Sequence, residues 1–214
     1  MNIYKDHYNK DIGYEVSFSR ERRVLELCGD VKSKRILDIG CADGYLGSKF
    51  KEKEANKVVG IDISENQIKE ARKKLDEAIS LDVQEEKIPF DDNYFDIVLI
   101  TEVIEHLFNP KKVIKKIKRV LNDDGFAVIT TPNFLVFSNR FKMFFGKFDY
   151  TETGVFDKGH VHFFSHSSLL NFVRENGFKV TEQNNLMHPK IPQFLSKIFP
   201  KVFVFQSIIK IRKK

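Results

Sequence analysis

The stretch from Arg35 to Gly47, RILDIGCADGYLG, constrains the fold more than any other part of the chain. Arg35 to Ile39 is an apolar run broken by one acid, which is typical of a parallel strand buried on both faces. Gly40 to Gly44 contains small residues that let a backbone turn tightly and approach a ligand closely. We interpret the stretch as a strand, a glycine loop and a helix N-terminus. Such a loop holds a nucleotide-like cofactor at the edge of an open α/β sheet, with backbone N–H groups facing the ligand.

The residues of this loop indicate which cofactor it binds. A dinucleotide fingerprint needs G-x-G-x-x-G, and Ala42 stands at its second glycine. Asp38 lies two residues before Gly40, where its carboxylate would repel a pyrophosphate and attract a cationic ligand. S-adenosylmethionine (SAM) carries an ammonium and a sulfonium. The loop therefore favours SAM over a dinucleotide.

A second carboxylate, Asp62, closes the apolar run from Val58 and lies 22 residues after Gly40. That is close to the spacing of roughly 20 residues at which an acid ending the second strand binds ribose hydroxyls. The alternative is that Asp62 only caps the next helix. Ser64-Glu-Asn-Gln67 is a capping box that can begin this helix by itself, which leaves Asp62 for a ligand.

Three ordered motifs, ILDIGCADG, VVGIDIS and FDIVLITEVIEHL, resemble the class I SAM-dependent methyltransferases, closely over residues 34–131. The resemblance implies a Rossmann-like α/β fold. Its seven-stranded, mostly parallel sheet has the order 3-2-1-4-5-7-6, an antiparallel last strand and helices on both faces. It places Asp82 at the adenine amino group and the Val83 N–H at the ring nitrogen beside it. The implied cofactor residues are Asp38, Gly40, Ala42, Asp43, Gly44, Asp62, Ile63, Asp82, Val83 and Thr101.

Length and composition predict a single domain over residues 1–214, since 42% of the residues are hydrophobic. An N-terminal helical segment, residues 1–33, contains a helix over 20–28 that packs on the sheet or covers the cofactor. Tyr4, His7, Tyr8 and Tyr14 precede it, with surface packing or closure over a ligand as their roles. The remaining expected strands are 57–61, 78–81, 95–100, 125–131, 178–181 and 202–211, and the remaining helices are 45–50, 65–75, one from Pro110, and one from Ser165 to Gly177.

Cysteine content and net charge indicate the compartment of the protein and the kinds of partner it binds. Cys28 and Cys41 form no metal-type pair, no signal-like stretch opens the chain and no apolar run is long enough to span a membrane, so we expect a cytoplasmic protein. The net charge of +6 bears on solubility and nonspecific attraction and does not by itself indicate a defined ligand, so we expect no nucleic-acid partner.

An aromatic-rich segment, residues 134–148, follows the fifth strand. The family inserts its substrate-recognition element there, so we interpret residues 133–163 as an acceptor lid. A peripheral membrane contact through 134–148 is the alternative, since Arg140, Lys142 and Lys147 accompany the phenylalanines. Phe-rich walls suit an aromatic or prenylated acceptor better than a glycan, and both acceptor classes remain open.

The EVIEH sequence provides the catalytic candidates. If a helix starts where strand four ends, Glu102, Glu105 and His106 share one face and suit Mg²⁺, Mn²⁺ or Zn²⁺. The stretch resembles the ubiquinone-pathway O-methyltransferases and the small-RNA terminal 2′-O-methyltransferases, which pair it with a later histidine. His160 falls at that position, with His162 as its rival. The alternative is that the E-H pair anchors the helix and His106 acts at most as a general base.

These observations predict a SAM-dependent methyltransferase that acts on a hydroxyl of a small-molecule or glycan acceptor. The alternative is a non-catalytic SAM-binding module that regulates a partner. EVIEH favours the enzyme, because such a module needs no cluster of carboxylates and imidazole at the end of strand four.

Overall fold

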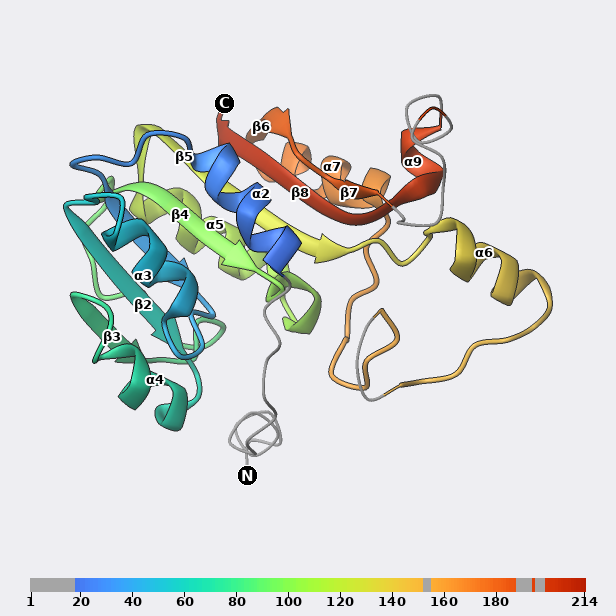
Figure 1. Ribbon diagram of the computed structural model, residues 1–214, viewed down its shortest axis with the longest axis horizontal. Coiled ribbons are helices and arrows are strands. Elements are labelled where there is room, and N and C mark those ends of the chain that lie inside the picture. Colours follow the sequence, from blue (N-terminus) through green and yellow to red (C-terminus); the bar gives the residue numbers. More distant parts are fainter. Residues whose placement is uncertain (1–17, 152–154, 188–193, 195–198) are drawn as a thin grey trace.

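The structure, a computed structural model, describes residues 18–151, 155–187, 194 and 199–214. Within these residues the strands form one sheet in the order β3-β2-β1-β4-β5-β8-β6, with β7 paired to β8 (Figure 1). β8 runs antiparallel to β5 and β6. The expected strand order is confirmed, and the two-residue β7 is an addition. The strands are β1 Arg35–Ile39, β2 Lys57–Asp62, β3 Glu77–Ser80, β4 Phe95–Thr101, β5 Leu121–Pro132, β6 Phe178–Gln183, β7 Leu186–Met187 and β8 Val204–Lys213.

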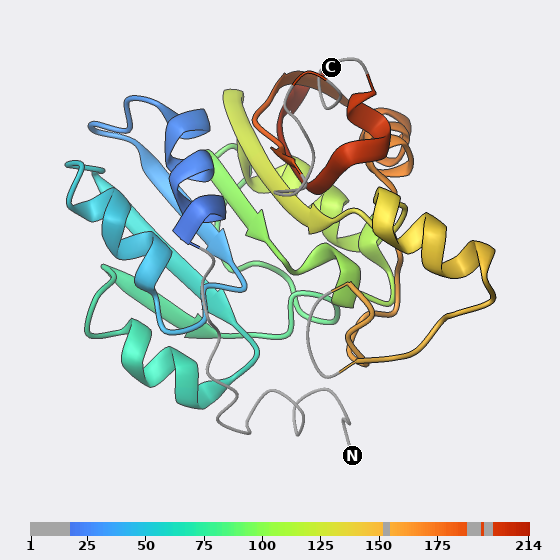
Figure 2. The same ribbon diagram turned by 45° about the vertical axis from the view of Figure 1, so that its right-hand side comes forward.

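Helices cover both faces of the sheet (Figures 1 and 2). α2 Phe18–Cys28, α3 Tyr45–Lys51 and α4 Glu65–Ala71 lie on one face, and α5 Pro110–Val120 and α7 His166–Glu175 on the other. Strand side chains alternate between the two layers, so that Ile36 belongs to the apolar cluster that includes α2 to α4 and Leu37 to the cluster that includes α5 and α7. This alternation explains why the apolar residues of β1, Ile36, Leu37 and Ile39, are all buried although they point to opposite faces.

Two short helices lie outside these layers. α6 Phe137–Phe144 follows the carboxyl end of β5, and α9 Pro200–Phe203 directly precedes β8 (Figure 1). α9 explains why β8 begins at Val204 rather than at residue 202. None of the helices in the described part of the chain is long and apolar enough to cross a bilayer.

The helix expected over 65–75 is shorter than predicted. α4 ends at Ala71, and the chain then turns so that Asp76 N donates to the Val58 carbonyl at 3.1 Å and leads into β3. Leu75 nevertheless stays buried at 6% exposure, as its place in the apolar stripe predicts. α2 matches the helix expected over 20–28, whereas Tyr4, His7, Tyr8 and Tyr14 lie outside the described residues.

Candidate active site

A pocket opens at the carboxyl ends of β1, β2 and β4. β1 and β4 are neighbours, and from them the chain winds outward in opposite directions, so the pocket lies at the switch point where open α/β sheets bind ligands. Nine of the ten expected cofactor residues line it: Asp38, Gly40, Ala42, Asp43, Asp62, Ile63, Asp82, Val83 and Thr101. Gly44 instead lies against α4, where a Cβ would approach the Ala71 Cα to 3.0 Å.

The glycine loop is fixed to the end of β2. Gly40 has φ +74°, and a Cβ there would lie 2.2 Å from a Val103 methyl, so only glycine fits. Gly40 N and Cys41 N donate to the Ile61 carbonyl at 2.7 and 3.1 Å, and Ala42 N donates to Asp62 at 2.9 Å. The expectation that the loop N–H groups face the ligand is wrong for these three residues. These three N–H groups are therefore not available as donors to an anionic pyrophosphate.

Asp38 is the most unusual group in the pocket. Its side chain is 1% exposed, and neither carboxyl oxygen has a hydrogen-bond partner among the described residues. Burial, and secondly the charge of Asp62, raise the pKa of Asp38 to about 7. A buried carboxylate without a hydrogen-bond partner is unfavourable in free energy when it is ionised, and a cationic ligand beside it would offset this penalty.

Asp62 performs a structural task as well as facing the pocket. One carboxyl oxygen accepts from Ala42 N and the other from Ser64 N, each at 2.9 Å. Ser64 accepts from Gln67 N at 3.4 Å and begins α4, as its capping pattern predicts. The Ile63 N–H is a third backbone donor to this carboxylate, which still has acceptor capacity toward the pocket. Burial raises its pKa against these backbone donors.

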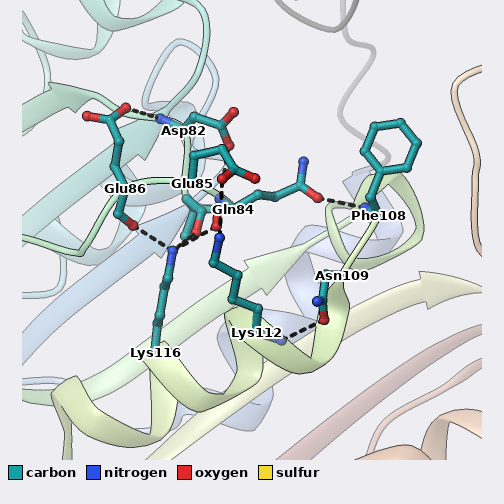
Figure 3. Close-up of polar contacts among 9 residues, drawn as sticks. Asp82, Gln84, Glu85, Glu86, Phe108, Asn109, Lys112 and Lys116 are labelled. Atoms are coloured by element: carbon teal, nitrogen blue, oxygen red, sulfur yellow. Dashed lines mark hydrogen bonds and ion pairs between the residues drawn. The ribbon is translucent and has the colours of Figure 1, made fainter.

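The far wall of the pocket is the turn from Asp82 to Glu86, which α5 holds in place (Figure 3). Lys116 Nζ donates to the carbonyls of Val83, Gln84 and Glu86 at 2.7, 3.0 and 2.6 Å. Burial, and next the charge of Lys112, lower the pKa of Lys116. One lysine thus fixes the segment that carries Asp82 and Val83.

The end of β4 differs from the expected helix. Glu102 has φ +54° and its N donates to the Thr130 carbonyl and hydroxyl at 3.2 and 3.1 Å, which extends the pairing of β4 with β5. Only a 3₁₀ turn, η1 Ile104–His106, follows. The prediction that Glu102, Glu105 and His106 share one helical face is therefore wrong. The Glu102 carboxylate accepts from the Thr130 hydroxyl at 2.7 Å and lies 3.5 Å from Arg20.

Glu105, His106 and His160 nevertheless come together, with one ligand-type atom of each within 4.8 Å of the others. His106 Nδ1 lies 3.0 Å from the Gly159 carbonyl and His160 Nδ1 3.0 Å from the Val155 carbonyl. Because a carbonyl only accepts, we assign the proton of each neutral ring to Nδ1, which makes Nε2 the nitrogen with the lone pair. His162 is outside this group, since its Nε2 lies 3.2 Å from the Phe108 carbonyl.

Glu105 is 2% exposed, and its carboxyl oxygens have no well-formed hydrogen bond among the described residues. Burial, and secondly the Glu102 carboxylate, raise its pKa well above the usual range. His106 is the one member of the group that also lines the pocket. It therefore joins the pocket to the cluster.

Arg20 is a pocket residue that was not predicted from the sequence, and it is the only lysine or arginine among the described residues that line the pocket. It comes from α2, pairs with Glu102, and shares the lining of the pocket with six acids: Glu21, Asp38, Asp43, Asp62, Asp82 and Glu102. No local pattern distinguishes Arg20 from Arg22 or Arg23, because only the packing of α2 on the sheet decides which one reaches the pocket. Thr130 and Lys116 were missed for the same reason.

Comparison with known proteins gives a consistent result. A family model described as a methyltransferase domain matches residues 8–183. A probable SAM-dependent methyltransferase of Mycobacterium tuberculosis strain H37Rv is 26% identical over 60% of this chain and 47% of its own length. The ubiquinone biosynthesis O-methyltransferase of Nitrosomonas europaea is 29% identical over 56% of this chain and 53% of its own length. The chain thus spans about half the length of these curated relatives. A SAM-dependent methyltransferase structure from Archaeoglobus fulgidus, at 21% identity, superposes with a TM-score of 0.66 over 91% of this chain and 92% of that one, which shows the fold.

Proposed function

Because the chain belongs to the class I SAM-dependent methyltransferase family, with SAM as the methyl donor, we propose that it methylates a hydroxyl of a small-molecule or glycan acceptor. The observation that carries this proposal is His106, which lines the cofactor pocket and belongs to the Glu105–His160 group. A base at that junction touches both the cofactor space and the space beside it. Hydroxyl methylation needs such a base, because the acceptor must lose its proton.

The pocket fits SAM by the chemistry of its donors. The buried, unpartnered Asp38 suits the ammonium, and Asp62 keeps acceptor capacity for the ribose hydroxyls. We assign Asp82 and Val83 to the adenine edge, on the turn that Lys116 holds. Arg20 is the only cation among the described lining residues and suits the carboxylate of the cofactor. When bound, SAM supplies an electrophilic methyl group on a sulfonium.

The catalytic part of the proposal concerns proton removal. The Gly159 carbonyl holds His106 Nδ1–H at 3.0 Å, so that Nε2 is the basic nitrogen. His160 packs edge-on against the same ring at a centroid distance of 4.7 Å and limits its rotation. Positioning contributes much of the rate of such an in-line displacement, because the reacting atoms must lie about 3 to 3.5 Å apart.

A divalent metal at the cluster is the alternative way to activate the hydroxyl, because a metal bound to His106 Nε2 would occupy the nitrogen that otherwise accepts the proton. Glu105, His106 and His160 would hold it, whereas Glu102 is engaged by Thr130 and Arg20. One carboxylate and two imidazoles suit Zn²⁺ or Mn²⁺ better than Mg²⁺, which prefers oxygen ligands. A cation there would lower the pKa of the acceptor hydroxyl.

The test is transfer of tritium from methyl-labelled SAM into a metabolite extract, with heat-denatured protein as the blank. We expect a labelled product that His106→Ala removes. His162→Ala is the matched control and should retain activity, because His162 contacts the Phe108 carbonyl outside the cluster. Saturable SAM binding with no labelled product from any extract would contradict the enzyme and support a non-catalytic module.

A further inference from the structure

Helix α6 buries a polar residue and exposes apolar ones, which is the reverse of an ordinary surface helix. Its buried residue is Asn139, whose side-chain nitrogen donates to the Phe134 carbonyl at 3.0 Å. Phe137, Phe141 and Phe144 occur at i, i+4 and i+7 and face solvent, with exposed fractions of 45%, 60% and 84%. A soluble helix normally buries this face. The structure instead presents it.

The exposed aromatic surface continues beyond α6. Phe145, Phe148 and Tyr150 are 60%, 42% and 56% exposed. We call the six exposed side chains the aromatic face: Phe137, Phe141, Phe144, Phe145, Phe148 and Tyr150. α9 adjoins it, since the Phe137 and Phe203 rings lie 5.7 Å apart. Exposed aromatic rings gathered in this way indicate an interaction site.

The charges beside the aromatic face indicate its partner. Arg140, Lys142 and Lys147 are all exposed among residues 137–151, and Asp149 is the only acid in that range. Protein interfaces are enriched in aromatic residues but depleted in lysine. Aromatic residues interleaved with basic ones are instead typical of a surface that enters the headgroup region of an anionic bilayer.

The aromatic face is also connected to the candidate active site. Phe148 packs against Phe156 and Phe134 with ring centroids at 5.0 and 6.2 Å. The chain that contains Phe156 continues to Gly159 and His160, which contact His106. Figures 1 and 2 show the chain leaving α6 and returning as a long loop toward the carboxyl end of the sheet. A surface bound to α6 would thus adjoin the acceptor side of the pocket.

We propose that the aromatic face docks this protein on anionic membrane surfaces and that the methyl acceptor is a membrane-resident molecule with a lipid portion. The docking stands on the exposed side chains alone, whereas the nature of the acceptor rests on the proposed function. The phenylalanines provide apolar contact with the acyl boundary, and the three basic residues provide attraction to lipid phosphates.

The test is co-sedimentation of the full chain with phosphatidylcholine vesicles, with and without phosphatidylglycerol. We expect binding that requires phosphatidylglycerol and weakens from about 0.1 M to about 1 M NaCl, as the Debye length falls from about 10 Å to about 3 Å. Phe141→Ser/Phe144→Ser should reduce the partition coefficient at least tenfold. Both positions are exposed, so the unfolding midpoint should not change.

A matched pair tests the charges. Lys142→Glu/Lys147→Glu should abolish binding, whereas Lys111→Glu/Lys115→Glu makes the same change in net charge at exposed positions of α5 and should retain it. Equal losses in the two variants would overturn the proposal, because net charge alone would then explain the binding. Absence of vesicle binding would overturn it as well, as would a dimer in sedimentation velocity that Phe141→Ser/Phe144→Ser dissolves, which would assign the face to a second copy. Calorimetry of S-adenosylhomocysteine binding without vesicles keeps the two proposals separate. A defective cofactor site would show as lost binding in that measurement, while vesicle binding through the aromatic face would be unaffected.

Discussion

Replacing Asp38 with asparagine should make the free protein less sensitive to pH. In the folded protein burial raises the pKa of Asp38 to about 7, whereas an unfolded aspartate titrates near 3.9. Between these values the folded state holds a proton that the unfolded state has released. Unfolding then releases a proton, so the free energy of unfolding falls as the pH rises, and the loss is complete above the folded pKa.

The size of the change in unfolding free energy follows from the part of the pH interval between the two pKa values that an experiment can cover. Between pH 5 and pH 8, about two pH units lie below the folded pKa, and at 1.36 kcal/mol per unit this is about 2.5 kcal/mol. The wild type should lose this amount relative to Asp38→Asn over that range. A constant cost of burying the asparagine amide cancels, because only the change with pH is compared. The neighbouring Cys41 thiol does not interfere, since burial raises its pKa far above this range.

The assay is denaturant unfolding of both proteins at pH 5, 6, 7 and 8, with cofactor-product affinity measured in parallel by calorimetry. For the wild type, affinity for S-adenosylhomocysteine should rise as the pH increases toward 7, because its ammonium binds the ionised carboxylate. Asp38→Asn should bind weakly at every pH. Parallel stability curves for the two proteins would refute the reasoning, because they would show that Asp38 is ionised in the folded state throughout.

Four further predictions concern the loop, the far wall and the cluster. Asp62→Ala should weaken S-adenosylhomocysteine binding by about 1.5 to 3 kcal/mol in calorimetry, because it removes a charged acceptor, and unchanged affinity in a folded variant would exclude that role. Ala42→Gly should raise the free energy of unfolding by about 0.5 kcal/mol, because Ala42 has φ +47°, and a clear loss would contradict the assigned strain. Lys116→Met should weaken S-adenosylhomocysteine binding about tenfold, because it leaves three carbonyls of the turn from Asp82 to Glu86 without their donor. Lys112→Met should not weaken binding, since it breaks only an exposed ion pair with Glu85, and equal effects of the two variants would refute the role of Lys116 in holding this turn. EDTA distinguishes the two ways of activating the hydroxyl: full turnover is expected if His106 is the base, whereas loss of methyl transfer that Zn²⁺ or Mn²⁺ restores would assign this step to a metal bound by Glu105, His106 and His160.

The features that could be predicted from sequence depend on neighbouring residues. The bounds of β1 are those expected, because an apolar run between a charged start and a glycine loop leaves little choice. The caps at Ser64, Asn109 and Ser165 form for the same local reason, since each side chain accepts from a backbone N–H three residues later. The strand order was available only through the resemblance, because no local pattern determines which strands pair.

The errors arose where a distant residue decides the local structure. Glu102 continues the pairing of β4 because Thr130, 28 residues later, accepts its N–H, so the helical spacing of EVIEH never forms. The Gly40 loop directs its N–H groups to Ile61 and Asp62 because β2 ends beside it. Neither contact has a sequence pattern, since each requires that the sheet is already assembled.

The failed helix at EVIEH changes what this motif can do. On a helix Glu102 would have joined Glu105 and His106, and three ligands would have come from one short segment. The positive φ of Glu102 instead turns its carboxylate to Thr130 and Arg20, on the cofactor side. Three of the four expected ligands, Glu105, His106 and His160, therefore remain together, and His160 reaches His106 from the segment that follows α6. The cluster is thus completed from the loop that follows the aromatic face. Displacement of that loop by a membrane bound to the aromatic face would therefore also move His160 relative to His106, which would link the proposed docking to the proposed catalytic group.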